Sequence, residues 1–591
     1  MLAESPTADS GVSGGRLPMR VLTAVAALPF IGFVLFLHGA VPGYSMPAFG
    51  QALWILGFAQ SFANSSLTSI FATDIGNPAP AAIAFGLPAA LTVGGALKLG
   101  LDGANAYAVG FAAWLVLAFW GCYRLGRLVG VGRLLSLACA AMWLSTPMLW
   151  MHEAYSSLAL GMSLLPLYAS CAWPIVFSGK PSIHFPALVA AAVISVFMDG
   201  YTFVMFAVAT GCLWSAGAIR RGESAIASGV RLGLIAVSFA TAYVLYTLYV
   251  GRSHFDLVPL DFFRAWGANI EFLFRPVLGL LWLSDLSGAA EGRAASNYFG
   301  DASVFTTPLS LFLMVAAAIG VVSWRGDKRA MLAFLIIAFI GFYFSLGPSF
   351  KFMVTKPADV TGPMMPETYA PIPTGTGFLS LYLPGFDAMR ASYRWAALGM
   401  FGLWAAFLSS AVGRRSLSGL QLAVAFAVML CNLPHLAWLD TYTEYRSDML
   451  NVEATASAID SSFTDGEKVF FAPWGNDFFI TYLAPTIGIK TFNIGGDKNL
   501  AAAVDQWPAE IQAFPQAFGP SYVDLVTQVL TKKTADAVAL SFIDNLAPTQ
   551  GWPVEQQFKA DAMRLADALE ANAALSVTRT DSYAIIRLRN N

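Results

Sequence analysis

The chain has 591 residues, of which 57% are hydrophobic and only 12% carry a charge. Soluble domains carry roughly 25% charged residues, so this composition indicates a polytopic membrane protein and excludes an ordinary soluble enzyme. The net charge is −2 and no broad basic face is evident, so nothing in the sequence indicates nucleic-acid binding.

The first apolar run follows a small, polar stretch from Met1 to Arg20. We interpret this run as a retained first span, because no small-residue cleavage site follows it. The five cysteines all fall in apolar runs and none has metal-ligand spacing. Neither a disulfide framework nor a zinc site is therefore expected.

Membrane-spanning helices need about 20 mostly apolar residues, and we expect about eleven of them. The predicted spans are 21–40, 105–123, 132–150, 156–177, 185–201, 202–219, 231–250, 305–323, 330–347, 393–413 and 416–437. The apolar segment 80–101 is broken by Pro88, Gly94, Gly95 and Lys98. A helix lying in the membrane interface suits this segment better than a crossing.

Placing segment 80–101 in the interface puts the basic clusters of all short loops on one side. These clusters are Arg16/Arg20, Arg124/Arg127/Arg133, Lys180, Arg220/Arg221/Arg231, Arg325/Lys328/Arg329 and Arg414/Arg415. Because short cytoplasmic loops carry an excess of Lys and Arg, the amino terminus is predicted to be cytoplasmic and the carboxy terminus to lie outside.

The character of the chain changes near Asp440, after which polar residues are frequent and no further span appears. We expect strands at 468–472 and 537–542, a helix over 558–571 and a closing hairpin around 580–582. The predicted domains are therefore a membrane module, 1–439, with a first outer loop over 42–104, and an extracytoplasmic α/β domain, 440–591.

A lone carboxylate, Asp74, stands in the stretch Phe71-Ala-Thr-Asp-Ile-Gly-Asn-Pro-Ala-Pro80 of the first outer loop. Its long segment, 42–104, otherwise carries only Lys98 and Asp102. A partly shielded acid at a membrane surface is costly and tends to be functional, and it can act as a general base toward a hydroxyl. The alternative is a turn or helix cap, since Asp-Ile-Gly-Asn-Pro is good turn chemistry.

The outer loops carry cations that the charge rule does not require, among them Lys351, Lys356, Arg390 and Arg394. Such cations suit a bound phosphate. Arg390 and Arg394 have i, i+4 spacing and are expected to point the same way from the head of a helix. The alternative is interfacial anchoring, which Arg, Tyr and Trp at the end of a span commonly provide.

Further polar residues stand at the outer ends of predicted spans. His152, Glu153 and Tyr155 follow one span, and Asp199 and Tyr201 lie between two others. They suit a polar acceptor pocket. The alternatives are a capped and solvated helix end, which the sequence favours for His152 and Glu153, and a tight Asp-Gly turn at Asp199. No cluster has metal-ligand spacing. The pair in Ile494-Gly-Gly-Asp-Lys is interpreted as an isolated glycine pair in a loop.

Taken together, the layout resembles the GT-C superfamily of integral membrane glycosyltransferases. The motifs are an outer loop with an acid before Asn-Pro-x-Pro, an interfacial helix, and a span that ends in Tyr123-Arg-Leu-Gly-Arg127. Later motifs are similar to the YfhO-like bacterial branch: Tyr298-Phe-Gly300, Leu346-Gly-Pro348, Pro384-Gly-Phe-Asp-Ala-Met-Arg390-Ala-Ser-Tyr-Arg394, Ala535-Asp-Ala-Val-Ala-Leu and Tyr583-Ala-Ile-Ile-Arg. Tyr298 and Tyr393, which stand in these motifs, join the predicted acceptor pocket.

The resemblance implies an enzyme of the bacterial inner membrane, with the carboxy-terminal domain in the periplasm. Its donor is a polyprenyl-phosphate-linked sugar, held by Lys351, Lys356, Arg390 or Arg394. Asp74 activates an acceptor hydroxyl on a glycan, lipid or protein, and the transfer inverts the anomeric centre. No cofactor is implied, and dependence on a divalent metal stays open. The alternatives are a lipid or glycan transporter and a non-catalytic protein of envelope assembly.

Overall fold

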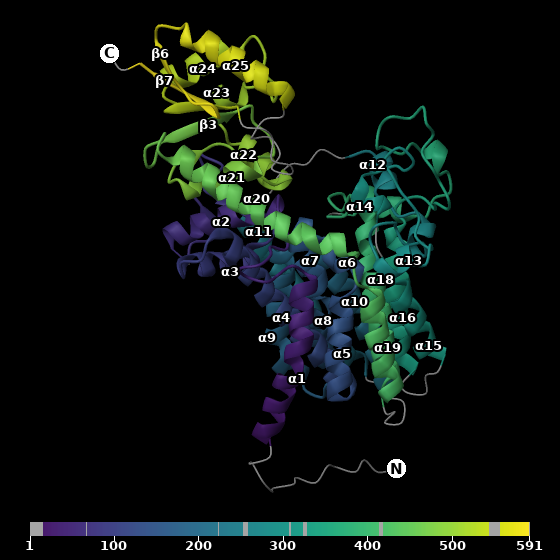
Figure 1. Cartoon of the computed structure of the whole chain (residues 1–591). Helices are drawn as coiled ribbons and strands as arrows, with labels where there is room; N and C mark the ends of the chain where they lie inside the picture. The colour runs from purple at the N-terminus through teal and green to yellow at the C-terminus, as the bar shows by residue number, and fades with distance from the viewer. Residues whose placement is uncertain are drawn as a thin grey trace, which may run out of the picture.

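The computed structural model describes residues 16–66, 68–222, 224–251, 258–306, 309–322, 328–383, 385–412, 418–542 and 556–589. Of the residues named above, Arg325, Pro384, Arg414 and Arg415 lie outside these ranges, as does the stretch 1–15. The described chain forms a bundle of long helices with a mixed α/β region above one end (Figure 1). We name that end of the bundle the sheet-side end.

The bundle consists of apolar helices. They are α1 (Arg16–Leu37), α4 (Gly103–Val129), α5 (Arg133–Leu144), α7 (Ser157–Ser163), α8 (Leu165–Phe177), α9 (Pro181–Met198), α10 (Gly200–Arg221), α11 (Ala225–Val250), α15 (Leu311–Val322), α16 (Lys328–Ser345), α18 (Ala396–Ser410) and α19 (Ser418–Cys431). Each range predicted as a span overlaps one of these helices, or the pair α7–α8.

Within the described ranges, four helices are long and apolar enough to cross a membrane: α4, α9, α10 and α11. The pair α7–α8, bent by 43°, passes the same test as one span. Shorter apolar stretches of 10–17 residues lie in α1, α5, α15, α16 and α19. The chain is therefore a helical membrane protein.

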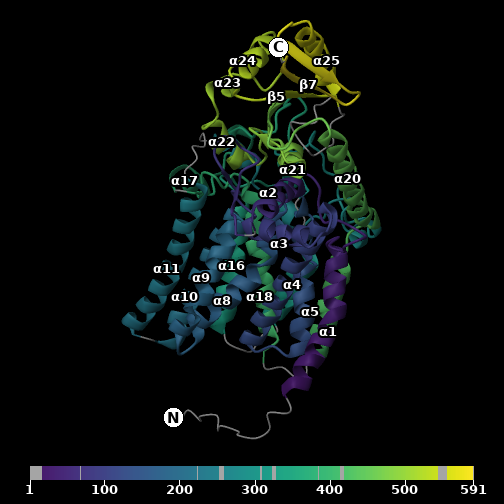
Figure 2. The same cartoon turned by 90° about the vertical axis from the view of Figure 1, so that its left-hand side faces the viewer.

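The first loop after α1 folds into α2 (Gln51–Ser65), the short hairpin β1 (Phe71–Ala72) and β2 (Ala81–Ala82), and α3 (Leu87–Lys98). α3 falls inside the segment predicted to lie in the interface, and it begins after Gly86 with proline in its first turn. α2 and α3 lie at the sheet-side end of the bundle (Figure 2). The hairpin frames residues 73–80, which include Asp74.

Short helices fill the other connections at the sheet-side end. They are α6 (Pro147–Trp150), η1 (Glu153–Tyr155), α12 (Leu260–Ala265), η2 (Ile270–Leu273), α13 (Trp282–Leu286), α14 (Ala302–Phe305), η3 (Glu367–Tyr369), α17 (Thr376–Tyr382) and η4 (Ser392–Trp395).

One long helix, α20 (Leu436–Asp460), leads from the bundle to the sheet (Figure 1). It is polar on average, yet it buries a stripe at helical spacing: Tyr442, Met449, Val452, Ala456 and Ile459. The predicted change of character at Asp440 therefore falls within this helix.

The five-stranded sheet has the order β4 (Lys490–Thr491), β3 (Lys468–Ala472), β5 (Ala537–Ser541), β7 (Tyr583–Leu588), β6 (Leu575–Arg579). The first three strands are parallel and the other pairings are antiparallel. The connections hold α21 (Phe478–Thr486), α22 (Asp497–Val504), α23 (Ala509–Gln512), α24 (Tyr522–Thr531) and α25 (Gln556–Glu570). The predicted strands, last helix and closing hairpin are confirmed.

The sheet is packed onto the bundle. One hydrophobic cluster runs from the bundle helices through α2 into the sheet and its helices. The closest approach is between α2 and α21, where a Cβ atom added at Gly57 would lie 2.1 Å from the carbonyl oxygen of Thr481. Only glycine permits this contact, because real side chains essentially never come so close.

We expect Gly57→Ala to lower the free energy of unfolding by about 1–3 kcal/mol, because the new methyl group forces α2 and α21 apart. Gly95→Ala in α3 is the matched control, since nothing lies within 4 Å of its Cβ position. Alanine there should be neutral or stabilising by up to about 1 kcal/mol. Thermal unfolding of the detergent-solubilised chain measures both, and equal melting of Gly57→Ala and the unmodified chain would contradict the close packing.

Candidate active site at the sheet-side end of the bundle

The guanidinium group of Arg394 lies among three tyrosine rings at the start of α18. Its Cζ atom is 4.7 Å from the ring centroid of Tyr155, 5.1 Å from that of Tyr201 and 5.8 Å from that of Tyr393. Its Nε donates a long hydrogen bond of 3.4 Å to the Tyr393 hydroxyl. No ion pair within 4.0 Å is found for it among the described residues. A guanidinium held by aromatic faces and lacking a carboxylate partner is suited to bind an anion.

The turn between α9 and α10 faces this cation. Asp199 begins α10, and its Oδ1 accepts a hydrogen bond of 3.0 Å from the amide of Thr202. Burial raises the pKa of Asp199 above its ordinary value, while the Thr202 amide and Arg394 oppose that rise. The hydroxyl of Tyr201 accepts a hydrogen bond of 2.8 Å from the amide of Ala391, which ties the turn to the chain just before η4. The turn is thus both a helix cap and a neighbour of Arg394.

His152 completes the aromatic wall around Arg394. Its ring centroid lies 5.6 Å from that of Tyr393 and 6.1 Å from that of Tyr155. Burial and the nearby Arg394 lower the pKa of His152 to about 3, so the ring is neutral. Nδ1 lies 2.9 Å from the Met148 carbonyl oxygen and therefore carries the proton. Nε2 is then a bare acceptor, and it has no hydrogen-bond partner in the described part of the chain.

Glu153 points away from this group, toward His38, which is not among the predicted site residues. Its carboxyl group contacts Nδ1 of the buried His38, directly after α1, and Nε2 of His38 donates to the Leu144 carbonyl at 2.7 Å. Tyr442 of α20 lies within electrostatic reach of Glu153. Burial raises the pKa of Glu153 to about 7. The one signal for His38 is a histidine at the very end of the first span.

Asp74 lies in a different set of contacts. Its Oδ2 accepts a hydrogen bond of 2.8 Å from the Ser61 hydroxyl of α2, and its side chain is half-buried. Burial raises the pKa of Asp74, and Ser61 and the nearby Lys490 partly offset this. In the described residues, no hydrogen bond or ion pair joins Asp74 to Arg390 or Arg394.

Arg390 does not share a helical face with Arg394, so the expectation from their i, i+4 spacing is wrong. The helical turn begins only at Ser392, as a 3-10 helix, and Arg390 precedes it. Arg390 instead pairs with Asp497 at 3.2 Å and lies 5.6 Å from the Phe262 ring centroid. Asp497 belongs to the Ile494-Gly-Gly-Asp-Lys stretch, whose sequence alone indicates only a glycine pair in a loop.

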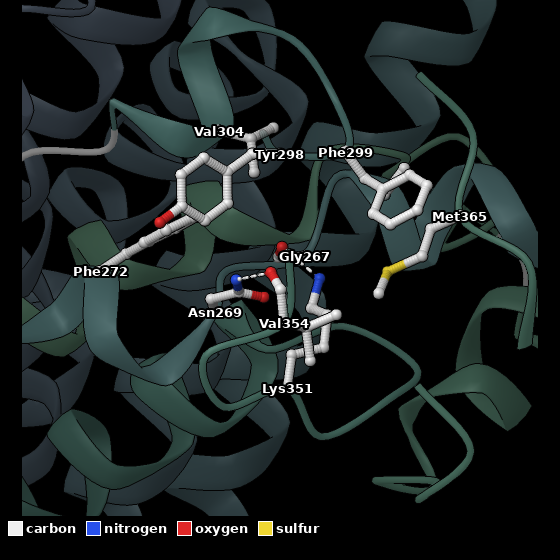
Figure 3. Close-up of a pocket in the computed structure, with 10 residues that line it drawn as sticks. Gly267, Asn269, Phe272, Tyr298, Phe299, Val304, Lys351, Val354 and Met365 are labelled. Carbon is white, nitrogen blue, oxygen red and sulfur yellow. Dashed lines mark hydrogen bonds between the residues drawn. The ribbon is translucent and has the colours of Figure 1, made fainter. Parts of the chain in front are cut away.

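Lys351 and Tyr298 line a separate small cavity, which has room for about one water molecule (Figure 3). The Lys351 ammonium donates to the carbonyl oxygens of Arg264 and Gly267. Burial lowers the pKa of Lys351 to about 7. Lys356 is half-buried, and its main-chain amide donates to the carbonyl of Asn297. These residues therefore do not lie in the aromatic group around Arg394.

Among the described residues, no group of three or more His, Cys, Asp or Glu side chains is placed to hold a metal ion.

Comparison with known proteins places this arrangement in a known fold. No protein-family model and no curated protein sequence matches the chain. A cryo-EM structure of the arabinofuranosyltransferase AftD from Mycobacteria matches with a TM-score of 0.52 at 14% identity, over 97% of this chain and 40% of that one. A mutant form of AftD gives 0.52 at 13% identity, over 97% and 42%. The chain has the GT-C fold.

The GT-C likeness is one of fold, since the identities are low. The chain spans about two fifths of the length of AftD. The oligosaccharyltransferase of Archaeoglobus fulgidus matches more weakly, over 88% of this chain and 68% of that one, with 11% identity and a TM-score of 0.39.

The free energy of unfolding should depend on pH through the protonation of Glu153. Its pKa rises from the ordinary 4.5 to about 7 in the folded chain, so between these values the folded chain holds a proton that the unfolded chain has lost. The free energy of unfolding should therefore fall as the pH rises through this window. Glu153→Gln, whose amide can still donate to His38, should flatten that fall. Thermal unfolding at a series of pH values between about 5 and 8 measures the pH slope of stability in the unmodified chain and in Glu153→Gln. The exposed Glu444→Gln is the control. Equal pH slopes in Glu153→Gln and the unmodified chain would contradict the assignment.

Proposed function

We propose that the chain is a glycosyltransferase that takes its sugar from a polyprenyl-phosphate-linked donor and transfers it to an acceptor hydroxyl. The observation that supports this most directly is Arg394, a cation among tyrosine rings with no carboxylate within 4.0 Å among the described residues. Arg is well suited to a phosphate, and a phosphate that leaves with the bonding electron pair needs such a cation. AftD, which shares the fold, is an arabinofuranosyltransferase.

The membrane arrangement belongs to the same proposal. The chain crosses the inner membrane of a bacterium about eleven times, with a cytoplasmic amino terminus, and the sheet-side end faces the periplasm. The region from about 440 onward, with its mixed sheet, is then a periplasmic α/β domain. The YfhO-like branch remains the proposed relative within the GT-C fold. Support comes from the one-sided clusters of Arg and Lys in the short loops.

In the proposed step, Arg394 binds the donor phosphate and Asp74 removes the proton from the acceptor hydroxyl. The acceptor oxygen forms a bond to the anomeric carbon while the bond from that carbon to the phosphate oxygen breaks. The electron pair leaves with the phosphate and the anomeric centre inverts. Asp199, opposite Arg394, is a positioning residue whose charge orients the guanidinium. The loop that carries Asp74 also reaches this turn, since Phe85 lies against Gly200.

We expect Asp74→Asn to lower kcat about 100-fold or more, since it removes the general base. Asp199→Asn should lower kcat less and mainly raise KM for the donor. The exposed Asp505→Asn is the control. Sugar transfer in detergent, with a short polyprenyl-phosphate sugar as donor, measures these effects beside thermal unfolding. Full activity in Asp74→Asn together with loss of activity in Asp199→Asn would show that Asp199, and not Asp74, is the general base.

Removal of the Arg394 charge should impair use of the donor. Arg394→Gln should lower kcat/KM for the donor at least tenfold, and about 100-fold if the contact strengthens as the phosphate leaves. Arg394→Lys keeps the charge but loses the planar fork, so an intermediate loss is expected. Arg579→Gln, which removes a partly exposed arginine that pairs with Asp567 and Glu570, is the control. Unchanged donor kinetics in Arg394→Gln would rule out its phosphate contact.

A further inference from the structure

A short segment of the sheet region, Gly495–Asn499, reaches down to the sheet-side end of the bundle. The side chain of Asn499 accepts a hydrogen bond of 3.1 Å from the amide of Ala84 and donates to the carbonyl of Ala82. Asp497 pairs with Arg390 at 3.2 Å. α22, which begins in this segment, lies over the end of α11 in both views (Figures 1 and 2).

The conformation of the segment depends on Gly496. Its φ of +89° favours glycine, and a Cβ atom there would lie 3.0 Å from the Trp54 ring of α2. Asn476 holds the backbone from the other side, because its Oδ1 accepts from the Gly496 amide at 2.6 Å and its Nδ2 donates to Asp497 at 3.0 Å. The glycine pair therefore allows the segment to pass close over α2.

The segment places one cation, Lys498, in an aromatic setting on the bundle. Its ammonium donates a hydrogen bond of 3.0 Å to the Tyr246 hydroxyl of α11. It lies 4.9 Å from the Tyr246 ring centroid and 5.7 Å from that of Phe85. Desolvation by burial lowers the pKa of Lys498. No ion pair with a carboxylate is found for it within the described ranges.

Lys498 and Arg394 flank the same turn. Arg394 lies over Tyr201 and within electrostatic reach of Asp199. A Cβ atom at Gly200, in the same turn, would be 3.3 Å from the ring of Phe85, over which Lys498 lies. Tyr246, the hydrogen-bond partner of Lys498, is also within electrostatic reach of Asp199. Two cations from segments about a hundred residues apart in the sequence thus approach the Asp199–Tyr201 turn.

A purely structural role explains Lys498 poorly. Asn499, Asp497 and the packing of Gly496 already join the segment to the bundle. An ammonium group held against two rings and a neutral hydroxyl, with no carboxylate within 4.0 Å among the described residues, costs desolvation free energy that a neutral side chain would avoid. A bound anion would pair with the ammonium group and offset this desolvation cost, so the setting of Lys498 suits an anion-binding site.

We propose that Lys498 binds the phosphate of the lipid-linked donor together with Arg394, so that the sheet region completes the donor site. This inference rests on the proposed function and extends it to a second binding residue. Arg394 offers a planar fork to two phosphate oxygens, and Lys498 offers a point charge. The phosphodiester of the donor carries one negative charge and the lipid monophosphate that leaves carries a second, so two cations suit the leaving phosphate better than one.

Binding of farnesyl phosphate to the full chain in dodecyl maltoside, measured by calorimetry with farnesol as the uncharged reference, tests the inference. Lys498→Gln should weaken farnesyl phosphate binding about tenfold and reduce its salt dependence, with farnesol binding and thermal unfolding unchanged. Lys498→Arg should restore most of the affinity. Lys532→Gln, which removes a surface lysine paired with Glu510, should have no effect.

Other outcomes separate this inference from the proposed function. Normal farnesyl phosphate binding in Lys498→Gln, together with weak binding in Arg394→Gln, would overturn the role of Lys498 and leave the proposed function standing. Equal loss of farnesyl phosphate and farnesol binding in Lys498→Gln would also overturn it, because a structural tie predicts that result. No preference of the unmodified chain for farnesyl phosphate over farnesol would overturn both proposals.

Discussion

The architecture depends on how the first loop covers the edge of the sheet. β4 is an edge strand, and its exposed main chain pairs with residues 74–77 of that loop. The Thr491 amide donates to the Asp74 carbonyl at 2.8 Å, and the Asn77 amide donates to the Thr491 carbonyl at 3.0 Å. An uncovered edge is a liability for a folded protein, and here the loop satisfies it. The same contact fixes the backbone of Asp74 and holds the sheet over the bundle.

The covered edge explains why the polar groups of this end lie in separate sets. Asp74 is held by Ser61 near Lys490, whereas Asp199, Arg394 and their tyrosines lie at the ends of α9, α10 and α18. Glu153 and His38 form a third, buried set that extends to α20 through Tyr442. The loop that carries both Asp74 and Phe85 connects the first two sets, since Phe85 lies against Gly200.

The sequence predicts those parts of the structure that follow from local pattern. Apolar length placed every bundle helix, and short apolar runs placed β3 and β5, whose residues are buried on both faces of the sheet. The aromatic residues around Arg394 could be predicted from the sequence because they all stand at the ends of predicted spans. The helical pairing of Arg390 with Arg394 failed, since the chain enters α18 through a 3-10 turn that begins at Ser392. Spacing alone does not reveal where a helix starts.

Long-range contacts were not predictable in this way. Nothing local in Gly495–Asn499 indicates that Lys498 reaches Tyr246, about 250 residues earlier in the chain. A glycine pair in a loop has many explanations, and only the neighbouring Trp54 and Asn476 reveal why glycine stands there. Likewise, Lys351 looked like a free outer cation, yet its ammonium is taken up by two carbonyl groups.

The position of Lys498 links the seating of the sheet to occupation of the site. A ligand that contacts both Lys498 and Arg394 binds tightly only when the sheet region is seated on the bundle. Binding of that ligand must therefore stabilise the seated arrangement, by the difference between its affinities for the seated and unseated forms. By the same linkage, whatever seats the segment on α2 and α11 strengthens ligand binding. The exposed Asp497–Arg390 pair contributes little alone, since such ion pairs are worth about 0–1 kcal/mol. The seating must then rest on the packing of α2 against α21 and on the pairing of β4 with the first loop, so these contacts are structural determinants of the site although they bring no charge to it.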